Sequence, residues 1–122
     1  MRKRPIDPTP ASYAQAMEVT DARRLLFVSG QVPADAGNHV PEHFADQARL
    51  VWSNLFARLA AADMGPDDLV KVTIFLSDRC YREENAAVRR EMLGDISPAL
   101  TIIVAGIWDE QWLLEIEAIA AA

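Results

Sequence analysis

The sequence predicts a two-layer α/β (α+β) fold in which a mixed β-sheet carries two helices packed on one face. The final ten residues, LLEIEAIAAA, alternate with a period of two, which is typical of a strand. A longer segment that begins near residue 42 repeats apolar residues every three or four positions, which is typical of a helix. At 122 residues, the chain has the length of a single domain, which we take as residues 1–122.

The first half of the chain is expected to supply two strands and one long helix. Residues 5–15 hold three prolines and are predicted to be extended or irregular, because proline lacks the N–H that regular structure uses. Short strands are predicted at residues 16–19 and 25–29, and Gly30 ends the second of them. The helix is predicted at residues 42–62. Its apolar stripe consists of Phe44, Ala48, Val51, Leu55 and Leu59.

The second half is expected to supply three strands and a shorter helix. Residues 69–76 place an apolar set of side chains on one face and a mixed set on the other, which predicts a strand. A helix is predicted at residues 82–93, where Gly94 ends it. Strands are predicted at residues 101–105 and 113–122. The resulting order is strand, strand, helix, strand, helix, strand, strand.

The last strand also predicts a surface that needs a partner. Its even-numbered residues from 114 to 120 are apolar and should face the helices, which directs Glu115, Glu117 and Ile119 to the opposite face. Leu113 and Phe75 are expected on that same face, which makes it apolar enough to pack against another subunit. We therefore expect an oligomer. The alternative is that the two glutamates are simply solvated on an edge strand.

The charge balance excludes several classes of protein. The chain has 12 basic and 18 acidic residues and a net charge of −6, so no nucleic-acid partner is expected. Its one basic cluster, residues 2–4, lies at a terminus that is expected to be mobile. No charge-free stretch is long enough to span a membrane, so no membrane association is expected. The single cysteine permits no intrachain disulfide and suits the reducing cytoplasm, which is the predicted location.

No metal centre is expected from the ligand-type side chains. His39 and His43 are four residues apart, but Pro41 between them argues against a helical metal-binding pair. Both histidines are therefore expected on the surface. Cys80 has no neighbouring histidine in the sequence that would activate it, so it is expected to be a free structural thiol.

A set of short motifs spans nearly the whole chain. In order, they are Tyr13 before Gln15, SGQVP at residues 29–33, VKVTIFL at 70–76, Asn85, Pro98-Ala99, and EIEAIA at 115–120. Together they resemble the RidA family (reactive intermediate deaminase, also called YjgF and labelled endoribonuclease L-PSP). The resemblance implies a chorismate-mutase-like fold and a homotrimer with ligand clefts between subunits. It also implies hydrolysis of 2-imino or 2-enamino acids to 2-keto acids and ammonia, without a metal or cofactor.

The resemblance implies roles for individual residues. Glu117 matches the glutamate that holds the attacking water and can move a proton while a C=N bond is hydrolysed. Tyr13 and Asn85 match residues that shape the cleft. Gly30 matches a glycine whose backbone approaches the ligand, and Thr101 matches a serine or threonine beside the carboxylate site. The simpler alternatives are a packing tyrosine, a surface asparagine and a glycine that only ends a strand.

The chain departs from the family where the substrate carboxylate is bound. The family's arginine follows Pro-Ala, where this chain has Leu100, and the position two further on, usually cysteine, is Ile102. Losing a two-point charged hydrogen bond weakens carboxylate binding by about a hundredfold or more. Arg89 and Arg90 on the second predicted helix are candidates for a relocated cation, although solvated helix charges are the simpler interpretation.

The ligand is expected to be a small molecule. Trp108 and Trp112 flank the last turn and either wall the cleft, favouring a flatter ligand, or pack against a neighbouring subunit. Three functions remain open. The first is hydrolysis of an imine or enamine with Glu117 at the centre. The second is metabolite binding without turnover, and the third is endoribonuclease activity, which the acidic balance disfavours.

Overall fold

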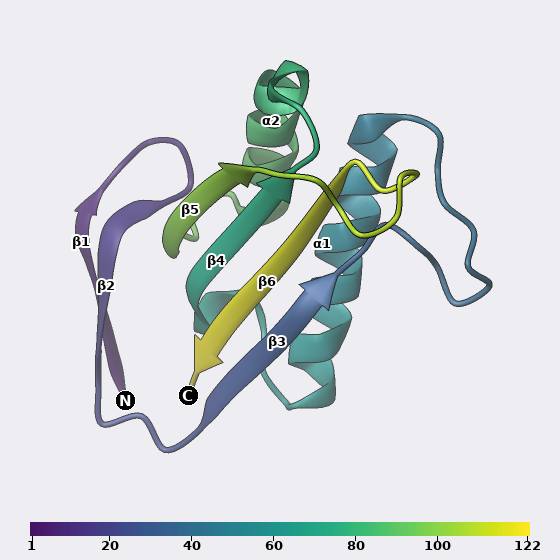
Figure 1. Ribbon diagram of the computed structural model, residues 1–122. Helices are drawn as coiled ribbons and strands as arrows, with labels where there is room; N and C mark the ends of the chain where they lie inside the picture. The colour runs from purple at the N-terminus through teal and green to yellow at the C-terminus, as the bar shows by residue number, and fades with distance from the viewer.

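The computed structural model describes residues 1–122 and contains six strands and two α-helices. The strands are β1 (Arg2–Pro8), β2 (Ala14–Thr20), β3 (Leu25–Gln31), β4 (Leu69–Leu76), β5 (Ala99–Val104) and β6 (Leu114–Ala121). The helices are α1 (Phe44–Ala61) and α2 (Arg82–Leu93), and short 3₁₀ helices lie at Pro66–Asp68 and Arg79–Tyr81. All six strands form one sheet in the order β1, β2, β5, β4, β6, β3 (Figure 1).

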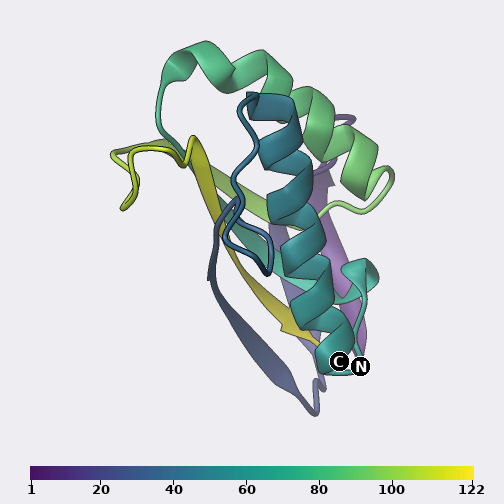
Figure 2. The same cartoon turned by 90° about the vertical axis from the view of Figure 1, so that its right-hand side faces the viewer.

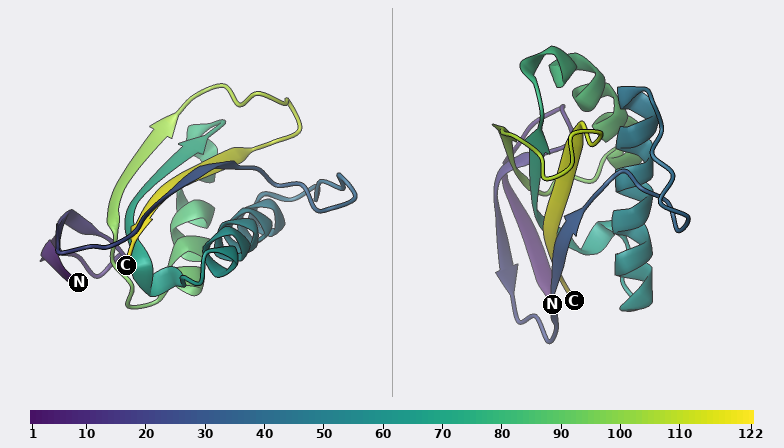
Figure 3. Two further views of the ribbon diagram at one scale, coloured as in Figure 1. Left: turned by 90° about the horizontal axis from the view of Figure 1, so that it is seen from below. Right: turned by 45° about the vertical axis from the view of Figure 1, so that its right-hand side comes forward.

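Both helices cover one face of this sheet, and the other face is open (Figures 2 and 3). The sheet is mixed because β4 runs parallel to β5 and antiparallel to β6. We call the two sides the covered face and the open face. The predicted two-layer α/β architecture is confirmed. Neither helix is long and apolar enough to cross a membrane.

The first strand was missed by the sequence prediction, which treated residues 5–15 as extended or irregular. Arg2–Pro8 pairs antiparallel with β2 and forms the outer edge of the sheet. Prolines in a sheet are confined to edge strands and strand ends, and β1 is an edge strand that ends at Pro8. The basic residues 2–4 are therefore part of the sheet and not a mobile terminus. Arg4 forms an exposed ion pair with Glu18 at 3.1 Å.

The other predicted elements all occur, with differences at their ends. β4 and α2 have the predicted bounds. β5 begins at Ala99 instead of residue 101, because its pairing with β4 starts at Lys71 opposite Ala99. α1 spans residues 44–61 instead of 42–62, and β3 continues to Gln31, two residues beyond its predicted end.

The core lies between α1, α2 and the covered face. The predicted alternation of β6 is confirmed, since Leu114, Ile116, Ala118 and Ala120 are all buried. From α1, the predicted apolar stripe packs onto this face, and Trp52 joins it with no exposed surface. Under α1, one chain therefore completes the packing of the covered face by itself.

The open face carries apolar side chains that nothing in the chain covers. Phe27 is 70% exposed, and Ile103 is 43% exposed. The edge of β5 is also largely free, because β2 pairs with β5 only at Ala14 opposite Ala99. Beyond that point, residues 101–104 of β5 are exposed. The same departure of β2 from β5 is visible in Figure 1.

Candidate functional site

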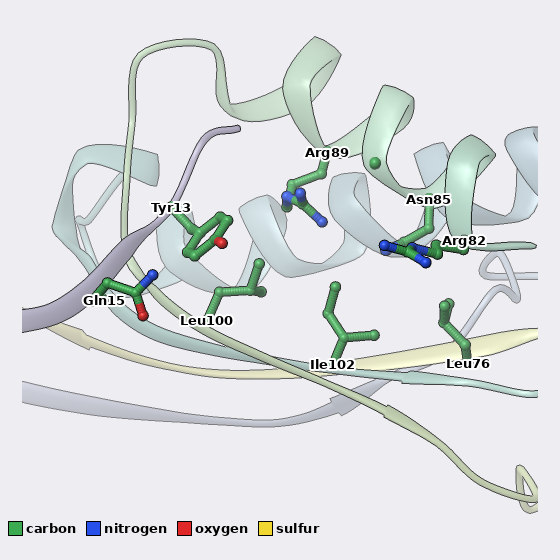
Figure 4. Close-up of a pocket in the computed structure, with 9 residues that line it drawn as sticks. Tyr13, Gln15, Leu76, Arg82, Asn85, Arg89, Leu100 and Ile102 are labelled. Carbon is green, nitrogen blue, oxygen red and sulfur yellow. The ribbon is translucent and has the colours of Figure 1, made fainter. Parts of the chain in front are cut away.

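A cavity of about 480 Å³ lies between α2 and the covered face of β4 and β5. The segment that enters β2 closes one side of it (Figure 4). The lining residues are Tyr13, Gln15, Leu76, Arg82, Asn85, Ala86, Arg89, Leu100 and Ile102. The volume falls in the range of small-molecule sites. Four of the residues predicted to shape the ligand site are thus brought together: Tyr13, Asn85, Leu100 and Ile102.

Helical and strand periodicity explain why these side chains meet. Asn85 and Arg89 are one turn apart on α2, so both point toward the sheet. Leu100 and Ile102 are two residues apart on β5, opposite Val72 and Ile74 of β4, so both face α2. The floor of the cavity is therefore apolar, and its roof is polar.

Two polar atoms in the roof have no partner. Asn85 is 1% exposed, and its Oδ1 accepts no hydrogen bond. Arg89 is 4% exposed; its Nε and Nη2 donate to the carbonyl oxygen of Ala11 at 3.3 and 3.2 Å, but its Nη1 donates to nothing. The interpretation of Arg89 as a solvated helix charge was wrong, whereas Arg90 is exposed as that interpretation requires. Burial lowers the pKa of Arg89.

Tyr13 forms the wall beside Arg89. The Arg89 guanidinium lies 5.9 Å from the centre of the Tyr13 ring, within range of a cation–π contact. Local hydrogen bonds fix this part of the chain, because Ser12 Oγ donates to the carbonyl of Gly94 at 2.7 Å and Thr9 Oγ1 donates to that of Tyr13 at 2.9 Å. Figure 4 shows the guanidinium descending from α2 between Tyr13 and Asn85, toward the two strand residues.

Glu117 and Thr101 are not in this cavity. Both lie on the open face, in a row where Thr73 of β4 sits between them. Glu117 is exposed. Lys71 Nζ donates to Thr101 Oγ1 at 2.6 Å on the same face. Within one chain, the sheet therefore separates the predicted carboxylate from the predicted cleft residues.

Gly30 lies against a second carboxylate of the open face. A Cβ atom at Gly30 would overlap Oε2 of Glu115, so a larger residue there would displace the end of the Glu115 side chain. Glu115 is half-buried and pairs with Phe75 of β4. Sequence reasoning had assigned no separate role to Glu115. It stands two residues from Glu117 on the same side of β6, as the alternation of the strand had predicted.

The remaining candidates lie on the surface. His39 and His43 are exposed, as predicted. Cys80 is exposed. Desolvation, and to a smaller extent the contact with Asp78, raises the pKa of its thiol, which favours the protonated and less reactive form. Trp108 is 94% exposed in the loop before β6, and Trp112 is half-buried.

The fold defines a class: two-layer α/β domains with a mixed sheet and two helices on one face, here with a cavity between α2 and the sheet. Comparison with known proteins is more specific. A family model described as endoribonuclease L-PSP matches residues 3–122. The chain belongs to this family, the RidA or YjgF family, as the motifs in the sequence had predicted.

Individual relatives agree with this assignment. The mitochondrial protein mmf2 of Schizosaccharomyces pombe is 38% identical over 128 residues, which cover 99% of both chains. TdcF of Escherichia coli, which is named for reactive intermediate deaminase activity, is 31% identical over 70 residues, 57% of this chain and 54% of TdcF. The structure of the Rid family protein YyfB from Yersinia pestis matches with a TM-score of 0.86 and 25% identity, and covers all of both chains. Since one of these relatives is mitochondrial, the cytoplasmic location stays a prediction.

Proposed function

We propose that this chain forms a homotrimer that binds a small metabolite in clefts between subunits and hydrolyses an imine or enamine there. The observation that carries the proposal is the cavity at α2, where Asn85 Oδ1 and Arg89 Nη1 are buried without partners. Buried polar atoms are nearly always paired, so two unpaired atoms in one cavity indicate a place that a ligand completes. Membership of the RidA family and the similarity to TdcF support the reaction class.

A second copy of the chain supplies what the cavity lacks. No aspartate or glutamate lines the cavity, while both carboxylates of interest stand on the open face. If the open face of a neighbour packs against the free edge of β5, its carboxylates approach the cavity from outside. The exposed Phe27 and Ile103 support this packing, because an apolar surface of this kind is typical of a subunit contact.

In the proposed reaction, a carboxylate positions the attacking water. It accepts a proton as the water oxygen bonds to the C=N carbon, and the proton then passes to nitrogen. Ammonia leaves as the C=O bond forms, so an imine and water give a ketone and ammonia with no redox change. Glu117 is the proposed carboxylate. Glu115 is the second candidate, since it shares the face and contacts Gly30.

The specificity is proposed to differ from that of family members with an arginine on this strand. Leu100 offers no hydrogen bond, so a carboxylate cannot be held at that position. Ordinary amino-acid imines are therefore expected to be poor substrates. Leu100→Arg should raise their hydrolysis if the rest of the cleft is intact.

Ammonia release from 2-aminoacrylate, generated in the assay, tests these points. We expect slow release by the wild type, a loss of about a hundredfold or more in Glu117→Gln, and faster release in Leu100→Arg. Glu115→Gln is the matched variant on the same face. If only Glu115→Gln is inactive, the role belongs to Glu115; if neither change matters, the mechanism is wrong. Rapid release by the wild type would contradict the proposed specificity.

Metabolite binding without turnover is the second candidate function. Leu100 favours binding without turnover, since this chain has an apolar residue where active relatives are expected to bind the substrate carboxylate. In that case ligands would raise the melting temperature by mass action while no ammonia appears. Endoribonuclease activity is disfavoured by the net charge of −6, and no cleavage of RNA is expected.

A further inference from the structure

Arg89 is a buried cation with no acidic partner. The three ion pairs of the protein all join exposed side chains, and none of them includes Arg89. A charge removed from water is normally paired, because its desolvation is otherwise uncompensated. Burial lowers the pKa of Arg89, and the next residue, Arg90, acts in the same direction. An anion beside the guanidinium would reverse both effects.

The hydrogen bonds of Arg89 leave one end of the guanidinium free. The group has five N–H donors in a planar fork. One edge, formed by Nε and Nη2, is used by the carbonyl of Ala11. The other edge consists of Nη1 and the second N–H of Nη2, and Nη1 is buried without any partner. Two parallel N–H groups of this kind match the two oxygens of a carboxylate.

The surroundings of this free edge suit an anion with an apolar body. The cavity wall contains two arginines, Arg82 and Arg89, and no acidic residue, in a chain whose net charge is −6. Leu100, Ile102 and the Tyr13 ring supply apolar walls (Figure 4). Holding the Ala11 carbonyl accounts for only one edge of the guanidinium. It gives no reason for the positive wall or for the free donor.

We propose that Arg89 is an anion-binding residue, and that its Nη1 and Nη2 hold the carboxylate of a small ligand whose apolar part packs on Leu100 and Ile102. Because Arg89 projects from α2 and not from β5, it holds the carboxylate at a different place in the cavity from a residue at position 100. This inference rests on the proposed function only in taking the cavity as the ligand site. It concerns binding and requires no turnover.

Calorimetric titration of the full chain with benzoate and with benzamide tests the assignment, because these probes have the same shape and differ in charge. Benzoate should bind at least about tenfold more tightly than benzamide. Arg89→Gln should abolish this preference, and Arg89→Lys should restore part of it, since lysine keeps the charge but loses the fork. Arg90→Gln is the matched control on the exposed side of α2 and should change nothing.

A second pair of variants tests the inference if Arg89→Gln fails to fold. Leu100→Glu places a carboxylate on the strand that faces Arg89; it should block benzoate binding, while Leu100→Gln should retain the preference for benzoate over benzamide. Benzoate that binds no more tightly than benzamide, or equally well to wild type and a folded Arg89→Gln, overturns the inference. These outcomes are independent of ammonia release. A chain without deaminase activity can still show the charge preference, and an active one can lack it.

Discussion

The two faces of the sheet differ in whether a single chain can bury the apolar side chains that they carry. On β6, Ile116 has no exposed surface, whereas Ile119, three residues later on the other face, is only half-buried. On β5, Leu100 and Ile102 close a cavity under α2, while Thr101 and Ile103 project from the open face. The covered face specifies the fold. The open face carries apolar side chains that nothing in the chain covers, so the proposed site, which uses residues of both faces, depends on assembly.

The largest effect is expected from a core truncation on the covered face. Ile116→Ala should lower the free energy of unfolding by about 2–5 kcal/mol, because it leaves a cavity among α1 and the neighbouring strands. Ile119→Ala removes the same atoms from the open face of the same strand. In the dissociated protomer it should cost far less. Urea unfolding at low protein concentration measures both, and equal losses would show that the two faces do not differ as described.

A charge on the open face should act on assembly instead of on the fold. Burying a phenylalanine is worth about 1.5–3 kcal/mol, so Phe27→Glu should shift a trimer toward single protomers at micromolar concentration. Light scattering after gel filtration reports the mass. Ala57→Glu, on the exposed side of α1, is the control. A wild type that is itself a monomer would contradict the role given to this face.

The smallest expected change in stability belongs to the contact between Gly30 and Glu115. Gly30→Ala should displace the end of the flexible Glu115 side chain and alter stability by only about 1 kcal/mol or less. Any hydrolysis that depends on this carboxylate should nevertheless fall. Gly106→Ala, where the added atom meets nothing, is the control. In a Glu115→Ala background the effect of Gly30→Ala should vanish, and a persistent effect would mean that the contact is not its cause.

The elements with an unbroken pattern could be predicted from the sequence. β4 and α2 have the expected bounds because their side chains alternate or recur without interruption. β1 could not be found this way, since its prolines argue against a strand and only its position at the sheet edge permits them. Edge position is a property of the whole fold.

The candidate site was predicted in part. The motifs named Tyr13, Asn85, Leu100 and Ile102 as site residues, and all four line one cavity, while their role in binding stays a prediction. The burial of Arg89 was missed because a charged residue is normally assigned to solvent. The four-residue spacing between Asn85 and Arg89, which places both on the same side of α2, was the signal in the sequence for this burial. Likewise, Thr101 lies between two cavity residues on one strand, so alternation alone assigns it to the opposite face.

The prolines of β1 have a consequence for the fate of the chain at high concentration. Pro5 and Pro8 lie three residues apart, so alternation turns only one of their nitrogens to the outer side of β1, where an added strand would find no N–H. The missing donor weakens edge-to-edge pairing on this side of the sheet, which disfavours the strand-by-strand growth that produces fibrils. The prolines argued against a strand in the sequence. In the fold, they disfavour edge-to-edge association of a chain that also exposes apolar side chains on its open face.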